Sequence, residues 1–368
     1  MAVIGAGLVG RACAWQLLRR GHEVLLLDPL QLDSDRRCDP PPDTGSWAAL
    51  GVLMAQVFQR SSGRAWRLRQ RSLELWGQWR QQLAERGKPL PWRPGLLLLA
   101  SSTDELERQQ RLVAERQAMG LPLELWSRER LHGLAPALPE AALGGLFSPQ
   151  DGQLDPAPVL EALLRDGLER GLQTCCDSAA RLERSPAGWT VQTRGGLALP
   201  AEAVVLCAGV ASAALLEPLG HHRALEPVLG QALELALAAP TRWTGPDAGM
   251  WPGAVVWQGL NLVPRPDNRL WLGATLEPGD RPEPTALAAL RNLGGQGPTW
   301  LQQAEVLRQW QGHRPHPIGR PAPLLEQLEP GLLLASGHYR NGALLAPATA
   351  EWVANQLESP TGAPLTKP

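Results

Sequence analysis

A short stretch near the start of the chain limits the fold more than any other part of the sequence. The apolar run Val3-Ile4 leads into Gly5, Gly7 and Gly10, and a helical pattern follows from Arg11 to Arg20. In this G-x-G-x-x-G spacing, the first glycine permits a tight strand-to-helix turn, the second lets backbone approach a pyrophosphate, and the third lets helix and strand pack closely. The helix N-terminus offers free N–H groups to the phosphates. The stretch therefore predicts a dinucleotide-binding unit.

The residues after this helix support the same interpretation. A second apolar run, Val24 to Leu27, ends in Asp28. An acidic residue at this distance accepts hydrogen bonds from ribose hydroxyls, and it argues against a 2′-phosphate. A glycine triplet alone is weak evidence, but here the strand, the helix and the acid stand in the expected order. A glycine-rich turn without a ligand is the less favoured alternative.

The sequence gives no sign of export or of a membrane segment. Only Met1 and Ala2 precede the first strand, which leaves no room for the basic region and apolar core of a signal peptide. The longest apolar run, around Val204 to Leu219, is broken by small residues and falls short of the ~20 residues of a membrane span. A net charge of −1 gives no general attraction to nucleic acid or to anionic lipid. We expect a soluble, cytoplasmic protein.

Cysteine usage agrees with that location. The five cysteines are odd in number and show no metal-ligand spacing, so no metal site is predicted. The adjacent pair Cys175-Cys176 is expected to stay reduced in the cytoplasm. With 368 residues and 44% hydrophobic content, the chain can bury one large core or two moderate ones.

Two kinds of apolar pattern divide the rest of the chain. Continuous runs at Val204–Leu206 and Leu332–Ala335 are typical of strands covered on both faces of a parallel sheet. From Leu229 to Leu276, alternating runs separated by turn signals predict antiparallel strands. We expect an α/β fold, with a Rossmann-like parallel-sheet domain interrupted by an α+β substrate domain whose sheet is mainly antiparallel.

The changes in pattern also suggest boundaries. The nucleotide-binding domain is expected at residues 1–85, 147–222 and 311–358, the substrate domain at 86–146 and 223–310, and a tail at 359–368. A proline-rich loop is predicted at 29–43, and helices at 63–86, 103–119, 156–170, 284–293 and 347–357. Asp155 and Pro156 suit the cap and first position of the third of these helices.

Motifs spread over nearly the whole length match one family. Besides the glycine motif and Asp28, they are Ala48–Leu53, Asp151–Pro156, Val204–Gly209, Leu262–Arg265, Gly273–Thr275, Gly312–Pro315 and Gly337–Pro347. The chain resembles flavin-dependent amine oxidases of the D-amino acid oxidase family, and within it the glycine oxidases associated with thiamine biosynthesis. The resemblance implies non-covalently bound FAD as cofactor, and a small amino acid and dioxygen as reactants.

The resemblance also implies which positions contact FAD. The adenosine half and its surroundings would involve Gly5, Gly7, Leu8, Val9, Gly10, Asp28, Pro29, Ala179 and Gly209. The pyrophosphate and flavin would contact Gly45, Ser46, Leu50, Gly51 and Val52. The isoalloxazine ring would be wrapped by His338, Tyr339, Arg340, Asn341, Gly342, Ala343 and Leu344.

For the substrate, the resemblance implies that Arg314 holds a carboxylate and that Arg340 lies close by. A guanidinium fork binds a carboxylate through two parallel hydrogen bonds. Pro315 biases Arg314 toward an extended backbone at a strand end. The alternatives are a surface salt bridge for Arg314 and a carbonyl cap beside a glycine turn for Arg340.

Asn261 marks a departure from the family pattern. The glycine oxidases carry a tyrosine just before the Leu-Val-Pro-Arg run, and its hydroxyl helps to hold the carboxylate. Asparagine is shorter, so either a water fills the gap or the substrate differs. Glycine, sarcosine and small D-amino acids therefore all remain open as substrates.

The implied activity is oxidative deamination to an imino or 2-oxo acid with release of hydrogen peroxide, and it would supply thiamine thiazole synthesis. No general base is required, and His313 and His338 are expected to be structural. An FAD-dependent dehydrogenase with another acceptor and a non-catalytic flavoprotein subunit are the alternatives. A covalent flavin is disfavoured because no cysteine lies beyond Cys207, and an NAD enzyme because of the second glycine turn at 337–342. Nothing in the sequence decides whether the chain forms a homo-oligomer.

Overall fold

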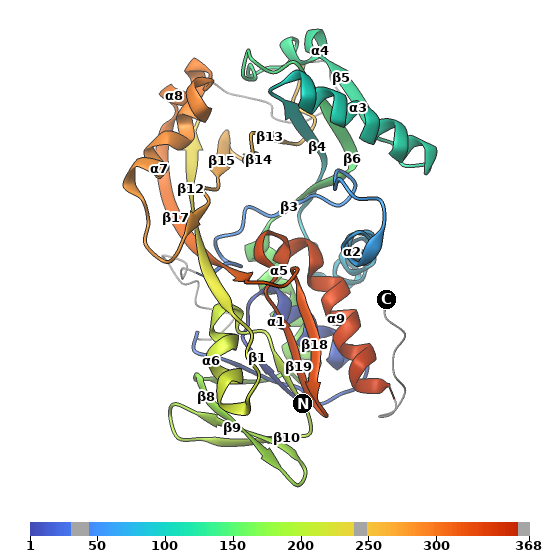
Figure 1. The fold of residues 1–368 in the computed structure, drawn as a ribbon, viewed down its shortest axis with the longest axis vertical. Helices are drawn as coiled ribbons and strands as arrows, with labels where there is room; N and C mark the ends of the chain where they lie inside the picture. Colours follow the sequence, from blue (N-terminus) through green and yellow to red (C-terminus); the bar gives the residue numbers. More distant parts are fainter. Residues whose placement is uncertain (31–43, 239–248, 360–368) are drawn as a thin grey trace.

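Two large sheets organise the molecule and lie one above the other along its length (Figure 1). A computed structural model describes residues 1–30, 44–238 and 249–359 of the chain. Most of the predicted proline-rich loop and of the predicted tail lies outside these described residues. The first sheet and its helices form the lower half of the view, and the second sheet forms the upper half.

The first sheet holds six strands in the order β18-β19-β11-β1-β2-β7. Its strands are β1 Ala2–Ile4, β2 Leu25–Asp28, β7 Gln173–Cys176, β11 Val204–Leu206, β18 Leu324–Glu329 and β19 Leu332–Ser336. All neighbouring pairs are parallel except β18 with β19. Every residue of β1, β11 and β19 is buried, because helices α1 (Leu8–Arg19), α5 (Pro156–Glu169) and α9 (Gly342–Glu358) cover one face of this sheet, while α6 (Ser212–Leu216) and a small three-stranded sheet cover the other. The predicted Rossmann-like parallel sheet is confirmed, with an antiparallel edge strand that the sequence pattern did not reveal.

Helix α1 (Leu8–Arg19) packs between α5 (Pro156–Glu169) and α9 (Gly342–Glu358), while α2 (Gly63–Glu85) packs on α9. The core between them is built around Trp15, Trp76 and Trp79, whose rings meet edge to face and are almost fully buried. Such aromatic pairs contribute beyond their buried area. The tryptophan content of the chain therefore serves, in part, to join these helices.

Helix α9 begins at Gly342, so the predicted start near Pro347 was too late. Pro347 lies inside the helix and has no N–H to donate to Ala343. The indole Nε1 of Trp76 donates instead to the carbonyl oxygens of Ala343 and Leu344, at 3.0 and 3.1 Å. A tertiary contact thus satisfies the carbonyls that the proline leaves free.

The second sheet holds ten strands and is mainly antiparallel, as predicted. Its strands are β3 Val52–Leu53, β4 Trp92–Ala100, β5 Glu124–Ser127, β6 Gly144–Leu154, β12 Leu225–Ala236, β13 Ala254–Trp257, β14 Leu260–Arg265, β15 Arg269–Gly273, β16 Glu277–Pro278 and β17 Glu305–Pro317. The long pair β12 and β17 extends from this sheet down to the first one (Figure 1). Its lower end therefore brings the second sheet close to the first.

Smaller elements complete the described structure. A three-stranded sheet is formed by β8 Ala179–Ser185, β9 Gly188–Thr193 and β10 Ala198–Ala201. The remaining helices are α3 Thr103–Ala118, α4 Arg128–His132, α6 Ser212–Leu216, α7 Pro284–Ala289 and α8 Thr299–Gln303. The helix predicted over 284–293 is shorter than expected, because a 3-10 turn over 290–295 follows α7 and both Leu293 and Gly294 have positive φ.

The predicted domain divisions at 147 and 311 fall inside β6 and β17, two strands of the second sheet. The assignment of segments to two domains otherwise stays a prediction. Over the described ranges, no helix combines the length and the apolar character that crossing a bilayer requires.

Candidate active site

A single large cavity brings together the segments that the sequence singled out. It has a volume of about 1090 Å³ and is lined by residues of the glycine motif, of β14, of β17 and of the 337–342 turn. Ligand sites usually occupy ~300–1,000 Å³, so this cavity is large enough for a dinucleotide together with a small substrate. One end lies over the carboxyl ends of β1 and β2, which we call the nucleotide end. The end beside Arg314 is the substrate end.

The nucleotide end is built from the glycine motif. Gly5 has a φ of +100°, and a Cβ there would lie 2.6 Å from the carbonyl oxygen of Cys207. A Cβ on Gly10 would overlap the carbonyl oxygen of Gly5, so α1 can begin this close to β1 only with glycine at both positions. The backbone N–H of Leu8, at the start of α1, donates to Ser46 Oγ at 2.9 Å. The turn therefore has the geometry that the spacing predicted.

Asp28 lies on the cavity wall at the end of β2. Its Oδ2 accepts from the N–H of Ala6 at 2.6 Å, and its Oδ1 accepts from the N–H of Leu30 at 2.9 Å. A carboxylate has about four acceptor positions, so two donors leave capacity for a ligand hydroxyl. The backbone contacts fix the carboxylate beside the glycine turn.

The segment 44–52 crosses the middle of the cavity. A Cβ on Gly45 would lie 2.6 Å from the carbonyl oxygen of His313, so glycine lets this segment lie against β17. Trp310 Nε1 donates to the carbonyl oxygen of Ala48 at 3.1 Å. Gly51 has a φ of +74° and packs against Leu154. The segment is therefore tied to both β17 and β6.

The second glycine turn closes the cavity from the C-terminal side. Gly337 has a φ of +64°, and Tyr339 has a φ of +53°, which is rare for a residue with a side chain. His338 is 4% exposed, and its Nε2 lies 2.9 Å from Thr349 Oγ1. Burial, helped by the charge of Arg64, lowers the pKa of His338 to about 3. The imidazole is therefore neutral near pH 7, and its structural role stays a prediction.

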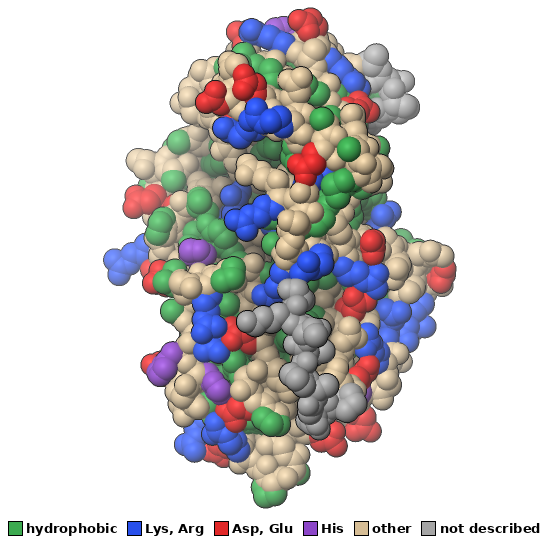
Figure 2. Space-filling view, turned by 45° about the vertical axis from the view of Figure 1, so that its right-hand side comes forward, with side chains coloured by type: hydrophobic (Ala, Val, Ile, Leu, Met, Phe, Trp, Pro, Cys, Tyr) green, Lys and Arg blue, Asp and Glu red, His purple; other side chains and the backbone are tan. Residues whose placement is uncertain are grey.

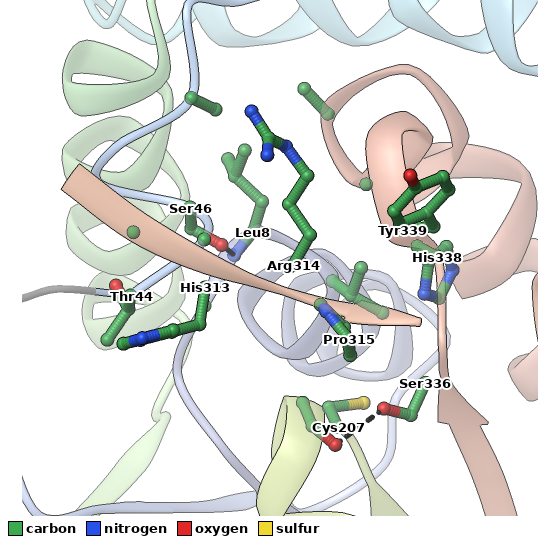
Figure 3. Close-up of a pocket in the computed structure, with 18 of the residues that line it drawn as sticks. Leu8, Thr44, Ser46, Cys207, His313, Arg314, Pro315, Ser336, His338 and Tyr339 are labelled. Atoms are coloured by element: carbon green, nitrogen blue, oxygen red, sulfur yellow. Dashed lines mark hydrogen bonds between the residues drawn. The ribbon is translucent and has the colours of Figure 1, made fainter. Parts of the chain in front are cut away.

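Arg314 extends from β17 into the cavity, between Leu8 and Ser46 on one side and Tyr339 on the other in the view of Figure 3. Its Nη1 donates to the carbonyl oxygens of Leu229 and Thr275, at 3.0 and 3.2 Å. Burial, followed by the nearby charge of Arg340, lowers the pKa of Arg314. The guanidinium is half-buried and anchored through one nitrogen only, so it is not the surface salt bridge considered as the alternative.

Gly230 makes that position of Arg314 possible. It lies on β12, two residues from the partner of Arg314 in the β12–β17 register, which pairs Val228 with Arg314. A Cβ built on Gly230 would overlap the guanidinium carbon and both of its terminal nitrogens. The cation therefore lies flat on the glycine backbone, a contact that the sequence pattern did not reveal.

Asn261 lies on β14 at the substrate end. Its Nδ2 donates to the carbonyl oxygen of Gly273 at 3.2 Å, which fixes the orientation of the amide. Its Oδ1 is buried and has no hydrogen-bond partner within the described structure. A buried acceptor without a partner costs free energy unless a ligand or a water supplies a donor.

Nearly all the predicted site residues lie on the wall of this cavity. They are Gly5, Gly7, Leu8, Val9, Asp28, Pro29, Gly45, Ser46, Leu50, Gly51, Val52, Ala179, Gly209, Asn261, Arg314 and the residues from His338 to Ala343, Arg340 included. Gly10 and Leu344 lie behind the wall, where Gly10 packs on Gly5 and Leu344 belongs to the core around α1. Their contact with a ligand stays a prediction.

The charges of the lining are distributed unevenly. The acidic residues that line the cavity are Asp28 and Asp177, both near the nucleotide end, where Arg194 also lies. The substrate end, in contrast, has Arg314 and Arg340 without a lining acid, and Arg60 and Arg69 line the cavity as well. The exposed face in Figure 2 shows no such separation, since Lys and Arg side chains lie beside Asp and Glu over its whole height. The substrate end is therefore suited to a carboxylate. Within the described ranges, no group of three His, Cys, Asp or Glu side chains could hold a metal ion.

These features fit a flavin dinucleotide, and the comparison with known proteins agrees. The family model described as FAD dependent oxidoreductase matches residues 1–356. The chain belongs to this family. FAD, the cofactor of the family, fits the glycine turn, the N-terminus of α1 and the acid at the end of β2, because these groups suit its pyrophosphate and ribose.

Individual relatives match nearly the whole of this chain. The glycine oxidase of Geobacillus kaustophilus is 28% identical over 97% of this chain and 92% of its own. The crystal structure of that organism's glycine oxidase has a TM-score of 0.85 at 27% identity, and the match covers 97% of this chain and 94% of the other. The bifunctional protein ThiO/ThiG of Nostoc sp. is 27% identical over 99% of this chain, which covers 53% of that protein.

Proposed function

We propose that this FAD-dependent oxidoreductase oxidises a small amino acid to its imino acid and transfers the electrons to dioxygen, which releases hydrogen peroxide. Hydrolysis of the imino acid would then give the 2-oxo acid and ammonia. The observation that carries the proposal is the half-buried guanidinium of Arg314, which lies in the same cavity as the glycine motif. The full-length similarity to proteins named glycine oxidase supports it.

Arg314 binds the substrate carboxylate in this proposal. Its Nη1 is already held by two backbone carbonyls, so the direction of the guanidinium is set before the substrate arrives. The other nitrogens can then form charge-assisted hydrogen bonds with a carboxylate. Arg340, which is exposed at the rim and reaches toward the carbonyl oxygen of Gly259, adds positive charge at the entrance.

Asn261 binds the substrate amine. Because its Nδ2 is held by Gly273, Oδ1 is the end of the amide that still needs a partner. Oδ1 can only accept a hydrogen bond, so it suits the N–H of an amine rather than a carboxylate. The asparagine thus differs in role from a tyrosine hydroxyl, which can donate. With Arg314 on the carboxylate and Asn261 on the amine, the substrate's α-carbon is fixed between them.

The remaining chemistry needs no general base. When bound, FAD accepts the two electrons and the hydrogen from the α-carbon. The chain's own contribution is orientation and the exclusion of water, which can supply a large part of a rate enhancement. His338 is neutral and bound to Thr349, so it does not exchange protons with the substrate near pH 7.

We propose that FAD is held without a covalent bond. Of the cysteines in the described structure, Cys207 lines the cavity, and it lies at the nucleotide end against Gly5 and Gly10. No cysteine of the described lining lies near Arg314. Acid denaturation should therefore release the flavin into the supernatant. A flavin that precipitates with the protein would contradict this point alone.

The test of the function is a panel of amines scored by peroxide release. Glycine, sarcosine and small D-amino acids are compared in air and with an artificial electron acceptor, so that an oxidase is distinguished from a dehydrogenase. Peroxide formation from at least one of them is the expected result. Turnover seen only with the artificial acceptor favours the dehydrogenase alternative. If no amine reduces the flavin under either condition, the protein is not an enzyme of this class.

Arg314→Ala tests the residue that carries the proposal. Loss of a hydrogen bond to a charged group costs ~1.5–3 kcal/mol, so KM should rise by roughly 10- to 150-fold while the FAD content stays unchanged. An unchanged KM would assign the carboxylate to another residue.

A role in thiazole synthesis remains part of the proposal, supported by the similarity to a protein named ThiO/ThiG.

A further inference from the structure

Seven residues without regular secondary structure form one wall of the cavity. This wall segment, residues 54–60, connects β3 to the start of α2, and the cavity lining includes Met54, Val57, Phe58, Gln59 and Arg60. A loop of this kind would usually be free to move, because no ladder of backbone hydrogen bonds holds it. Here two fully buried side chains of opposite charge take the place of such a ladder.

Asp151 holds the wall segment by its N–H groups. Its Oδ1 accepts from Ala55 N at 2.7 Å and from Gln56 N at 3.0 Å, and its Oδ2 accepts from Gln56 N and Val57 N, both at 3.1 Å. The side chain is 0% exposed. No arginine, lysine or histidine forms an ion pair with it in the described structure. A buried carboxylate without a counter-ion is costly, and hydrogen bonds from the three backbone amides and from the Ser148 side chain offset that cost.

Arg116, on α3, holds the same segment by its carbonyl groups. Its Nε donates to Gln56 O at 3.2 Å, and its Nη2 donates to Phe58 O at 2.6 Å and to Arg60 O at 3.2 Å. This residue is also 0% exposed, and its guanidinium lies over the ring of Trp66 at 4.2 Å. The N–H groups of residues 55–57 are thus bound by Asp151, and the carbonyl groups of residues 56, 58 and 60 by Arg116.

The wall segment is also connected to the second glycine turn. The ring of Phe58 lies 3.9 Å from the guanidinium of Arg69, and Arg69 Nη2 donates to Asn341 Oδ1 at 3.0 Å. Phe58 and Val57 therefore have fixed places on the cavity wall. They line the same cavity as Arg314, so a bulky substrate side chain that reaches this wall would have to displace them.

We propose that Asp151 and Arg116 are positioning residues that fix the wall segment, so that Val57 and Phe58 limit the size of the amino acid that the cavity accepts. The proposal rests on the proposed function for its reference to an amino acid, but the fixed wall itself does not. It also gives a role to the motif Asp151–Pro156, whose first residue acts on the cavity from a distance.

Asp151→Asn is the variant that tests this. Asparagine has nearly the same shape but replaces one acceptor oxygen with an NH₂ group, which would face the backbone N–H groups. Asp166→Asn is the matched control. Asp166, on α5, is also 0% exposed, but it accepts from Trp15, Arg86 and Arg170 and does not line the cavity. Both variants lose a buried carboxylate, and only one loses contact with the wall segment.

Hydrogen exchange of the FAD-loaded protein gives the first readout, which needs no substrate. In Asp151→Asn, the amides of residues 55–57 should exchange at least about tenfold faster, since a hydrogen bond to a charged group is lost at each. In Asp166→Asn they should exchange as in the wild type. Equal rates in Asp151→Asn and the wild type, or equal acceleration in both variants, would overturn the proposal.

Substrate size gives the second readout. The kcat/KM of a larger D-amino acid relative to the smallest substrate should rise severalfold in Asp151→Asn, through KM, and should not change in Asp166→Asn. An unchanged ratio despite faster exchange would show that the wall does not select size. If Asp151→Asn does not fold, the same two measurements are made on Arg116→Gln, which removes hydrogen bonds to the carbonyl groups of the wall segment. Absence of all turnover would count against the proposed function, while the exchange result would still decide the fixed wall.

Discussion

The two ends of the cavity are built in different ways. At the nucleotide end, the glycine turn and Asp28 come from one continuous stretch, residues 1–30, and the turn is held by hydrogen bonds of its backbone N–H groups. At the substrate end, side chains from β14, β17 and the 337–342 turn meet, although they lie far apart in the sequence. The first end offers a general site for a cofactor, whereas the second depends on a few side chains that can be exchanged. The following substitutions should therefore have effects of different kinds at the two ends.

The largest effect is expected from Gly10→Ala at the nucleotide end. The new Cβ would overlap the carbonyl oxygen of Gly5, and neither backbone can move without opening the turn. We expect a loss of more than ~3 kcal/mol in the free energy of unfolding, together with the loss of bound FAD. Denaturant unfolding measures the free energy of unfolding, and flavin absorbance measures the bound FAD.

Gly77→Ala is the control for that substitution. Gly77 lies in α2 with nothing near its missing Cβ, so alanine should leave FAD unchanged and stabilise the helix by roughly 0.5–1 kcal/mol. A Gly10→Ala protein that still contains a full complement of FAD would show that the close helix–strand contact is not needed.

At the substrate end, Gly230→Ala should weaken substrate binding and leave FAD in place. The Cβ would take the space of the Arg314 guanidinium, so the substrate should lose about 1.5–3 kcal/mol of binding free energy. KM should therefore rise by roughly 10- to 150-fold. The decisive measurement is a double-mutant cycle with Arg314→Ala. If Gly230 acts only through Arg314, Gly230→Ala should increase KM very little in a protein that already carries Arg314→Ala. Fully additive effects would give Gly230 an independent role.

The second glycine turn should make stability depend on pH. The pKa of His338 is about 3 in the folded protein, while the unfolded chain binds its proton near pH 6.5. The unfolded state therefore binds more protons between these values, so stability is complete above pH 6.5 and declines as the pH falls toward 3. From pH 6.5 to 5 the loss should be about 2 kcal/mol.

His338→Gln should remove this decline relative to the wild type. Burial raises the pKa of Asp151 to about 6, so this residue makes the folded protein more stable as the pH falls from about 6 to 4. Asp151 is present in both proteins, so its effect cancels in the comparison. Urea unfolding at pH 6.5 and pH 5 gives the comparison. The same difference between the two pH values in both proteins would show that His338 is not held neutral.

The smallest effect is expected from Asn261→Leu. Leucine has a similar volume and cannot accept a hydrogen bond, so about 1 kcal/mol of substrate binding free energy should be lost. The value of kcat/KM should therefore fall roughly fivefold. FAD content and the KM effect of Arg314→Ala should be unaltered. A rise in kcat/KM would mean that Asn261 Oδ1 has no substrate donor to bind and only destabilises the site.

The same contrast explains how far the sequence could predict the structure. The turn around Gly5 and the buried strand β11 were predictable because spacing and apolar runs determine them locally. The start of α9 was not, because the partners of the carbonyls near Pro347 come from Trp76, a residue of another helix. Likewise, Arg314 could be named from the resemblance, but its contact with Gly230 depends on the register of β12 and β17.

The orientation of the Asn261 amide and the contacts of Asp151 and Arg116 with residues 54–60 illustrate the same limit. The sequence shows that Asn261 is short, but the direction of its amide follows from the neighbouring strand through Gly273. Asp151 belongs to a motif visible in the sequence, yet its partners Ala55, Gln56 and Val57 lie almost 100 residues earlier, at sequence separations of 96, 95 and 94. Long-range side-chain contacts of this kind leave no local pattern.

The most direct test of the central claim is the reduction of bound flavin by an amino acid without oxygen. The FAD-loaded protein is mixed anaerobically with glycine, sarcosine or a small D-amino acid, and the loss of flavin absorbance is followed over time. The wild type should be bleached by at least one of them, and Arg314→Ala should need roughly 10- to 150-fold more of that amine for the same rate. Flavin that stays oxidised with every amine, or equal amine dependence in both proteins, would contradict the assignment of one cavity to cofactor and carboxylate together.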